Sequence, residues 1–108
     1  MDTIKIRGKE FRLKYTLRNY LVYEQITGTP FVSGKLLNVI TLLYCVLLAN
    51  NDSFKMQFKD FMDALDEDDT IIQTFSKWLN GEVEKRKLLT PDQPEEIDKK
   101  VNKKKVSQ

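Results

Sequence analysis

Residues 36–49 read LLNVITLLYCVLLA, the most apolar stretch of the chain, which only Asn38 and Thr41 interrupt. If this stretch forms a helix, with about 100° of rotation per residue, its larger apolar side chains cover an arc of about 240° around the helix axis. A helix on the surface of a domain needs an apolar stripe of only about 100° or slightly more. We therefore expect a helix that Ser33 caps, that runs to about Asn50, and that lies at the centre of the domain or meets another chain.

The N-terminal residues 3–16 alternate between apolar and basic side chains around Gly8-Lys9. Such a period of two is typical of a β-hairpin with one buried and one exposed face. The positions expected on the buried face are Ile4, Ile6, Phe11, Leu13 and Tyr15. A two-stranded hairpin is only marginally stable alone, so we expect this face to pack on helices.

Three more segments have the apolar spacing of helices. Residues 17–27 follow a possible N-cap at Thr16 and stop at Gly28, and residues 58–65 and 71–79 repeat the i, i+3, i+4 pattern. Asn80-Gly81 leaves the end of the last helix open. The predicted fold class is α+β, with an N-terminal β-hairpin packed on a cluster of about four helices. We expect one domain over residues 1–89 and a disordered, charged tail over residues 90–108, where aromatic residues are absent.

The composition argues against catalysis. The 108 residues contain no histidine, one cysteine and a formal net charge of +2. Without histidine, the most common general base and the most common zinc ligand are both missing. Cys45 lies in the apolar helix, where an inert buried thiol is expected, and it has no second cysteine for a disulfide. We expect a protein without catalytic residues, cofactor or metal, and an intracellular one, since neither a signal peptide nor a membrane span is apparent.

A basic face on the hairpin gives one alternative function. Lys5, Arg7, Arg12 and Lys14 alternate with the apolar positions and could contact the phosphates of a nucleic acid. Against this, the aromatic residues of the hairpin are expected on its opposite face, where they cannot stack on bases. Exposed strands also carry such residues simply to prevent aggregation. Nucleic-acid binding through these four residues is therefore the second hypothesis.

The order of features resembles a known family. The segments that carry the resemblance are IKIRG at 4–8, YEQITG at 23–28, LLY at 42–44, residues 58–61 and a last helix with Trp78 before the charged tail. Together they are similar to the tail assembly chaperones of long-tailed, siphovirus-like bacteriophages. The resemblance covers roughly residues 3–80, and its most specific part is the segment from Arg18 to Gly28.

This resemblance implies a non-enzymatic protein of the host-cell cytoplasm that is absent from the mature virion. Such chaperones bind the tape measure protein, protect its hydrophobic helices from aggregation and help to recruit tail tube protein. Many also have a longer form made by ribosomal frameshifting, for which the codons of Lys103–Lys105 are a candidate site; a basic, solubilising tail is the alternative.

A chaperone of this kind needs an apolar surface, and the wide apolar arc of the central helix is the candidate. Leu42 and Leu48 lie at its margins and are the expected partner-binding residues, either for a client or for self-association. The alternative is that the hairpin and the Trp78 helix cover both leucines.

Overall fold

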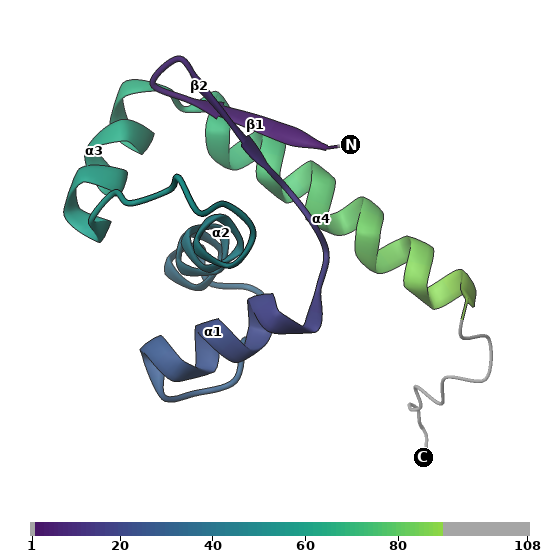
Figure 1. Cartoon of the computed structure of the whole chain (residues 1–108). Coiled ribbons are helices and arrows are strands. Elements are labelled where there is room, and N and C mark those ends of the chain that lie inside the picture. Colours follow the sequence, from purple (N-terminus) through teal and green to yellow (C-terminus); the bar gives the residue numbers. More distant parts are fainter. Residues whose placement is uncertain (1, 90–108) are drawn as a thin grey trace.

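The computed structural model describes residues 2–89, with side chains as far as Arg86. Its elements are β1 (Thr3–Ile6), β2 (Lys9–Arg12), α1 (Leu17–Thr27), α2 (Leu36–Asn50), α3 (Phe58–Glu67) and α4 (Thr70–Leu89). The hairpin and helices confirm the α+β class. Figure 1 shows α2 at the centre, between α1, α3 and the hairpin, with the long α4 beside the hairpin. The tail predicted over residues 90–108, with Lys103–Lys105, lies outside the described residues.

The hairpin closes with a two-residue turn at Arg7 and Gly8, whose φ angles are 51° and 79°. Two successive positive φ angles define the turn type whose twist suits a two-residue hairpin. The strands are antiparallel, and Ile4 pairs with Phe11 and Ile6 with Lys9. Ile4, Ile6, Phe11 and Leu13 are all buried, as the alternation predicts. The turn lies one residue earlier than Gly8-Lys9.

The outer edge of β2 is joined to the end of α2 by one side chain. The backbone N–H of Arg12 donates to Asn51 Oδ1 at 2.8 Å, and Asn51 Nδ2 donates to the Arg12 carbonyl at 3.1 Å. The same nitrogen also donates to the carbonyl of Leu47, in the last turn of α2. The amide therefore satisfies both backbone groups of Arg12 that face away from β1.

Both predicted ends of α1 are confirmed. The Thr16 hydroxyl accepts a hydrogen bond from the backbone N–H of Asn19, which is typical of an N-cap. Gly28 adopts a left-handed conformation with φ 80°, and its N–H donates to the Glu24 carbonyl at 2.8 Å. A residue without Cβ suits this position, because left-handed backbone is unfavourable for other residues.

A buried amide network fixes α1 against α2 and the end of the hairpin. Asn19 is 1% exposed, and its Nδ2 donates to the Lys14 carbonyl at 2.7 Å. Its Oδ1 accepts hydrogen bonds from Asn50 Nδ2 at 2.9 Å and from the Thr16 hydroxyl at 3.0 Å. Asn50 also donates to the Val46 carbonyl within α2. Since Oδ1 and Nδ2 of Asn19 both have hydrogen-bond partners, its burial is tolerated.

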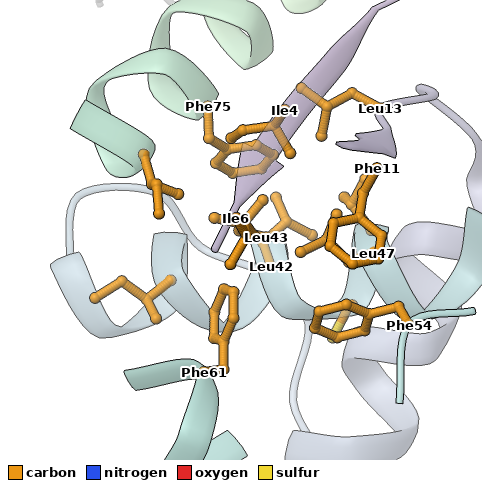
Figure 2. Packing of buried hydrophobic residues seen from close by; sticks show 14 of the residues in the cluster. Ile4, Ile6, Phe11, Leu13, Leu42, Leu43, Leu47, Phe54, Phe61 and Phe75 are labelled. Atoms are coloured by element: carbon orange, nitrogen blue, oxygen red, sulfur yellow. The ribbon is translucent and has the colours of Figure 1, made fainter. Parts of the chain in front are cut away.

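The second helix is central, as its wide apolar arc predicts, but it starts later. It begins at Leu36 after Lys35, whose side chain makes no capping hydrogen bond, so Ser33 is not its cap. Residues from Ile40 onward enter the core, where Leu42, Leu43, Cys45, Val46 and Leu47 are each at most 1% exposed. Figure 2 shows Leu42, Leu43 and Leu47 among residues from the hairpin, α3 and α4.

Aromatic residues close the remaining sides of the core. Phe11 and Phe54 meet edge to face with ring centroids 5.2 Å apart, and Phe61 of α3 lies 6.0 Å from Phe54. Phe75 of α4 packs on the hairpin side, near Ile4 (Figure 2). The fourth helix continues through Gly81 to Leu89, which answers the question that Asn80-Gly81 left open.

Candidate binding surfaces

Exposed apolar side chains are concentrated in one part of the chain. Six large apolar residues between positions 17 and 37 are each more than half exposed, whereas the only other exposed one within the described residues, Met62, is 38% exposed. We call these six residues together the apolar face, a set defined by their exposure and by their place in residues 17–37: Leu17, Leu21, Ile26, Val32, Leu36 and Leu37. Exposed apolar residues that gather in one region often mark an interaction site.

The position of Asn19 explains why α1 contributes to this face. Asn19 and Tyr23 are four residues apart and are the buried residues of α1, so they define its inner side. Leu17 and Leu21 are also four residues apart but point away from that side, and they are 73% and 52% exposed. An open hollow on the outer side of α1 is lined by Arg18, Leu21, Val22, Glu24 and Gln25. The sequence analysis gave neither leucine a binding role and therefore missed them.

The rest of the apolar face surrounds the connection between α1 and α2. Ile26 lies in the last turn of α1, Val32 in the connection, and Leu36 and Leu37 in the first turn of α2. Asn38 Nδ2 donates to the Val32 carbonyl at 2.8 Å, which ties the connection to that first turn. Leu36 and Leu37 are 64% and 61% exposed although α2 as a whole is the central helix.

The two leucines expected to bind a partner are not part of this face. Leu42 is 1% exposed, so the expectation that it forms an accessible margin of α2 is wrong. Leu42 belongs to the core cluster, and Figure 2 shows it among core residues from the hairpin, α3 and α4. Leu48 is half-buried and packs against the same core. The free apolar surface is at the start of α2, and the middle of the helix is covered.

The four basic residues of the hairpin do not act as one surface. Arg7 lies in the turn, where its Nε and one terminal nitrogen donate to the two carboxylate oxygens of Glu67 at 3.0 and 2.9 Å. This pairing raises the pKa of the Arg7 guanidinium. Lys5 is directly opposite Glu10 in the register of the hairpin. Only Arg12 and Lys14 remain as neighbouring cations without an acidic residue opposite them.

Arg12 and Lys14 line a cleft of about 360 Å³ between the hairpin and α4, which we call the hairpin–α4 cleft. Its other lining residues are Asp2, Leu13, Tyr15, Trp78, Glu82, Lys85 and Arg86. The indole N–H of Trp78 donates to Asp2 Oδ2 at 2.8 Å, which fixes the ring beside the start of the chain. The guanidinium of Arg86 lies over the ring of Tyr15, 4.3 Å from its centroid.

Tertiary packing thus brings aromatic rings and cations together in the cleft. Tyr15 and Trp78 are both half-buried, with ring centroids 6.3 Å apart. The Tyr15 hydroxyl shares a hydrogen bond with the Tyr20 hydroxyl, and burial raises the pKa of Tyr20. Sequence reasoning excluded aromatic stacking because it considered the hairpin alone. Trp78 reaches this site from another element, 76 positions from Asp2.

No metal site is apparent in the part of the chain that the structure describes. Within residues 2–89, no three acidic or cysteine side chains gather as metal ligands. Cys45 is fully buried, and burial raises the pKa of its thiol to about 11, where it is a poor nucleophile at neutral pH. Of the helices in these residues, none has both the length and the apolar character needed to cross a membrane.

Comparison with known proteins adds no relative. No family model, no curated protein and no solved structure matches the chain.

Proposed function

We propose that the protein is a non-enzymatic chaperone of bacteriophage tail assembly that binds hydrophobic helices of the tape measure protein. The observation that carries this proposal is the apolar face, with its six exposed side chains around α1 and the start of α2. An amphipathic client helix that lies on such a surface buries its own apolar residues at regular helical spacing. The resemblance of residues 3–80 to tail assembly chaperones supplies the identity of the client.

The size of the apolar face supports reversible binding. Burying a whole leucine or isoleucine side chain contributes about 1.5–3 kcal/mol. Each residue of the face is already partly covered, so a client gains about 1 kcal/mol from each residue that it covers. Association costs at least about 4 kcal/mol in lost freedom of motion, which leaves weak net binding. A chaperone that must hand its client to the assembling tail needs such binding.

The resemblance extends the proposal to other partners. In this hypothesis the protein acts in the cytoplasm of the infected host cell, is absent from the finished virion, and helps tail tube protein to reach the tape measure protein. Self-association before the client arrives is part of the same proposal, since a second copy can cover the apolar face. A longer, frameshifted form is a further expectation that the gene sequence tests directly.

The test uses the purified full chain and synthetic hydrophobic helical segments from the tape measure protein of the same phage. Light scattering measures aggregation of these segments with and without the chaperone. We expect the wild-type chain to suppress aggregation, and Leu21→Glu and Leu36→Glu to lose this effect, because a charge on the apolar face must be desolvated when the client binds.

Met62→Glu is the matched control, because Met62 is exposed on α3, outside the apolar face. It introduces the same charge at a similarly apolar exposed position and should keep full activity. Circular dichroism checks that all variants are folded. Equal activity of the three variants, or no suppression by the wild-type chain, would refute the proposal.

A further inference from the structure

The hairpin–α4 cleft lies outside the apolar face and has no role in the proposed chaperone function. It is formed by the strand end at residues 12–15 and by one side of α4 from Trp78 to Arg86. The apolar face belongs to α1, the start of α2 and the connection between them, and none of its six residues lines the cleft. A ligand of the cleft therefore leaves the apolar face accessible.

The charges of the cleft favour an anionic ligand. Four cations line it, against the two carboxylates of Asp2 and Glu82. Both carboxylates are already engaged, since Asp2 accepts the indole N–H of Trp78, and Glu82 pairs with Lys85 and Arg86 at 2.9 Å each. Arg12 and Lys14 are exposed on the opposite wall, and within the described residues neither side chain forms an ion pair.

The aromatic rings restrict the class of anion. Tyr15 lies on the hairpin wall, where the Arg86 guanidinium lies over its ring, and Trp78 lies on the α4 wall. Both side chains are half-buried. Stacking of a base on an aromatic ring contributes about 1–3 kcal/mol. An acidic peptide uses the cations equally well but has no flat ring to place on Trp78. The volume of about 360 Å³ is enough for one base with its sugar and phosphate.

We propose that the hairpin–α4 cleft binds single-stranded nucleic acid, with Arg12 and Lys14 contacting phosphates and Trp78 stacking on an unpaired base. Single strands are favoured over duplexes because a duplex keeps its bases stacked on each other and unavailable to Trp78. This assigns a nucleic-acid role to two of the four basic residues of the hairpin, together with residues of α4, and leaves Arg7 as a structural contact to Glu67.

The experiment uses Trp78 as its own reporter, because it is the only tryptophan of the chain. The full-length protein is titrated with a mixed-sequence, single-stranded oligonucleotide of about 12 nucleotides. Stacking should quench the tryptophan fluorescence, and affinity should fall steeply between about 50 and 200 mM salt. A duplex of the same length should bind more weakly and cause less quenching.

Two charge-reversal variants locate the site. The double variant Arg12→Glu, Lys14→Glu should lose about tenfold or more in affinity and show a smaller salt dependence, because two phosphate contacts are gone. The control variant Lys55→Glu, Lys59→Glu makes the same change in charge on the exposed side of α3 and its lead-in, away from the cleft. It should stay within about threefold of the wild type, as only long-range attraction is reduced.

Each other outcome overturns the proposal. Binding without quenching of Trp78, or an equal loss in both double variants, means that any contact is nonspecific attraction between charges. A polyglutamate peptide that competes with the oligonucleotide and binds as tightly makes the cleft a site for acidic peptides. Absence of binding at about 50 mM salt removes the site altogether. Quenching is measured on the wild-type protein, so this result is independent of the folding of the variants.

Discussion

Replacing Asn19 with aspartate should make the stability of the protein depend on pH. The side-chain amide of Asn19 donates to the Lys14 carbonyl at 2.7 Å, inside a region that water does not reach. In Asn19→Asp an oxygen takes the place of this donor. When the introduced carboxyl group is ionised, it repels the Lys14 carbonyl; when it is protonated, it can donate to it and restore the hydrogen bond.

The size of the pH effect depends on how strongly burial raises the pKa of the introduced carboxyl group and on the hydrogen-bond donors that remain around it. An ionised carboxyl group at this site keeps the donors of Thr16 and Asn50 but loses its contact with water. Its folded-state pKa is therefore raised above the unfolded value near ~3.9, and each unit of that rise corresponds to about 1.4 kcal/mol. A rise of about two units makes the variant ~3 kcal/mol less stable at neutral pH than well below pH ~3.9, and most of this change falls between about pH 4 and 7.

The direction in which stability changes with pH follows from the number of protons bound in the folded and unfolded states. Between the unfolded and the folded pKa, the folded variant holds more protons than the unfolded chain, so stability falls as pH rises. Urea unfolding followed by circular dichroism at about pH 4, 5.5 and 7 measures the difference between variant and wild type at each pH. Total stability for a domain of this size is of the order of 4–13 kcal/mol, so a change of ~3 kcal/mol is easily measured.

Asn38→Asp is the matched control. Asn38 is the third residue of α2, as Asn19 is of α1, and its Nδ2 also donates to a backbone carbonyl, at 2.8 Å. At both positions the positive end of the helix dipole stabilises an ionised carboxylate, because both lie in the first turn of a helix. The hydrogen bond of Asn38, however, is exposed to water. Its variant should change by less than about 1 kcal/mol with little dependence on pH. If both variants respond to pH in the same way, burial of Asn19 is not the cause and the reasoning is refuted.

Gly81→Ala should stabilise the protein by about 0.5–1 kcal/mol, because alanine favours a helix interior and no atom lies within 4 Å of the added carbon. Gly28→Ala should destabilise it by about 1–2 kcal/mol, because the φ of Gly28 is +80°. Urea titrations that find Gly28→Ala more stable than Gly81→Ala would contradict the left-handed backbone at Gly28 and the helical backbone at Gly81. The Cys45 thiol, with its pKa raised to about 11 by burial, should resist alkylation at neutral pH until the protein unfolds, and rapid labelling of the native protein would show that the core opens. Hydrogen bonds from Thr70 lower the pKa of Asp68. The wild type should therefore lose stability relative to Asp68→Asn as pH falls through that lowered pKa. If the free energies of unfolding of the two proteins change in parallel with pH, these hydrogen bonds contribute nothing to stability.

Local patterns predicted the elements of the fold well. The alternation of Ile4 to Leu13 fixed which side of the hairpin is buried, because strand side chains alternate with a period of two regardless of what covers them. Thr16 and Gly28 marked both ends of α1, since capping depends on the chemistry of single residues. The unusually wide apolar arc of residues 36–49 correctly indicated a central helix.

The candidate sites were harder to predict because they depend on which side of each helix meets the core. A buried Asn19 turns Leu17 and Leu21 outward, and hydrophobicity alone favours the opposite orientation. Leu42 was placed at a free margin because nothing in the sequence shows how α4 and the hairpin cover α2. The hairpin–α4 cleft joins residues near both ends of the described chain. Its only advance signal was the basic face of the hairpin, to which Arg12 and Lys14 belong.

The contact between Asn51 and β2 also affects how the protein behaves at high concentration. In this hairpin only Glu10 and Arg12 direct their backbone N–H and C=O groups away from β1 along β2, and the Asn51 amide occupies those of Arg12. At the β2 edge, a strand from another molecule would find only Glu10 to pair with, which is too few residues to extend the sheet there. The Asn51 side chain thus closes one of the two edges of this short sheet to the addition of another strand.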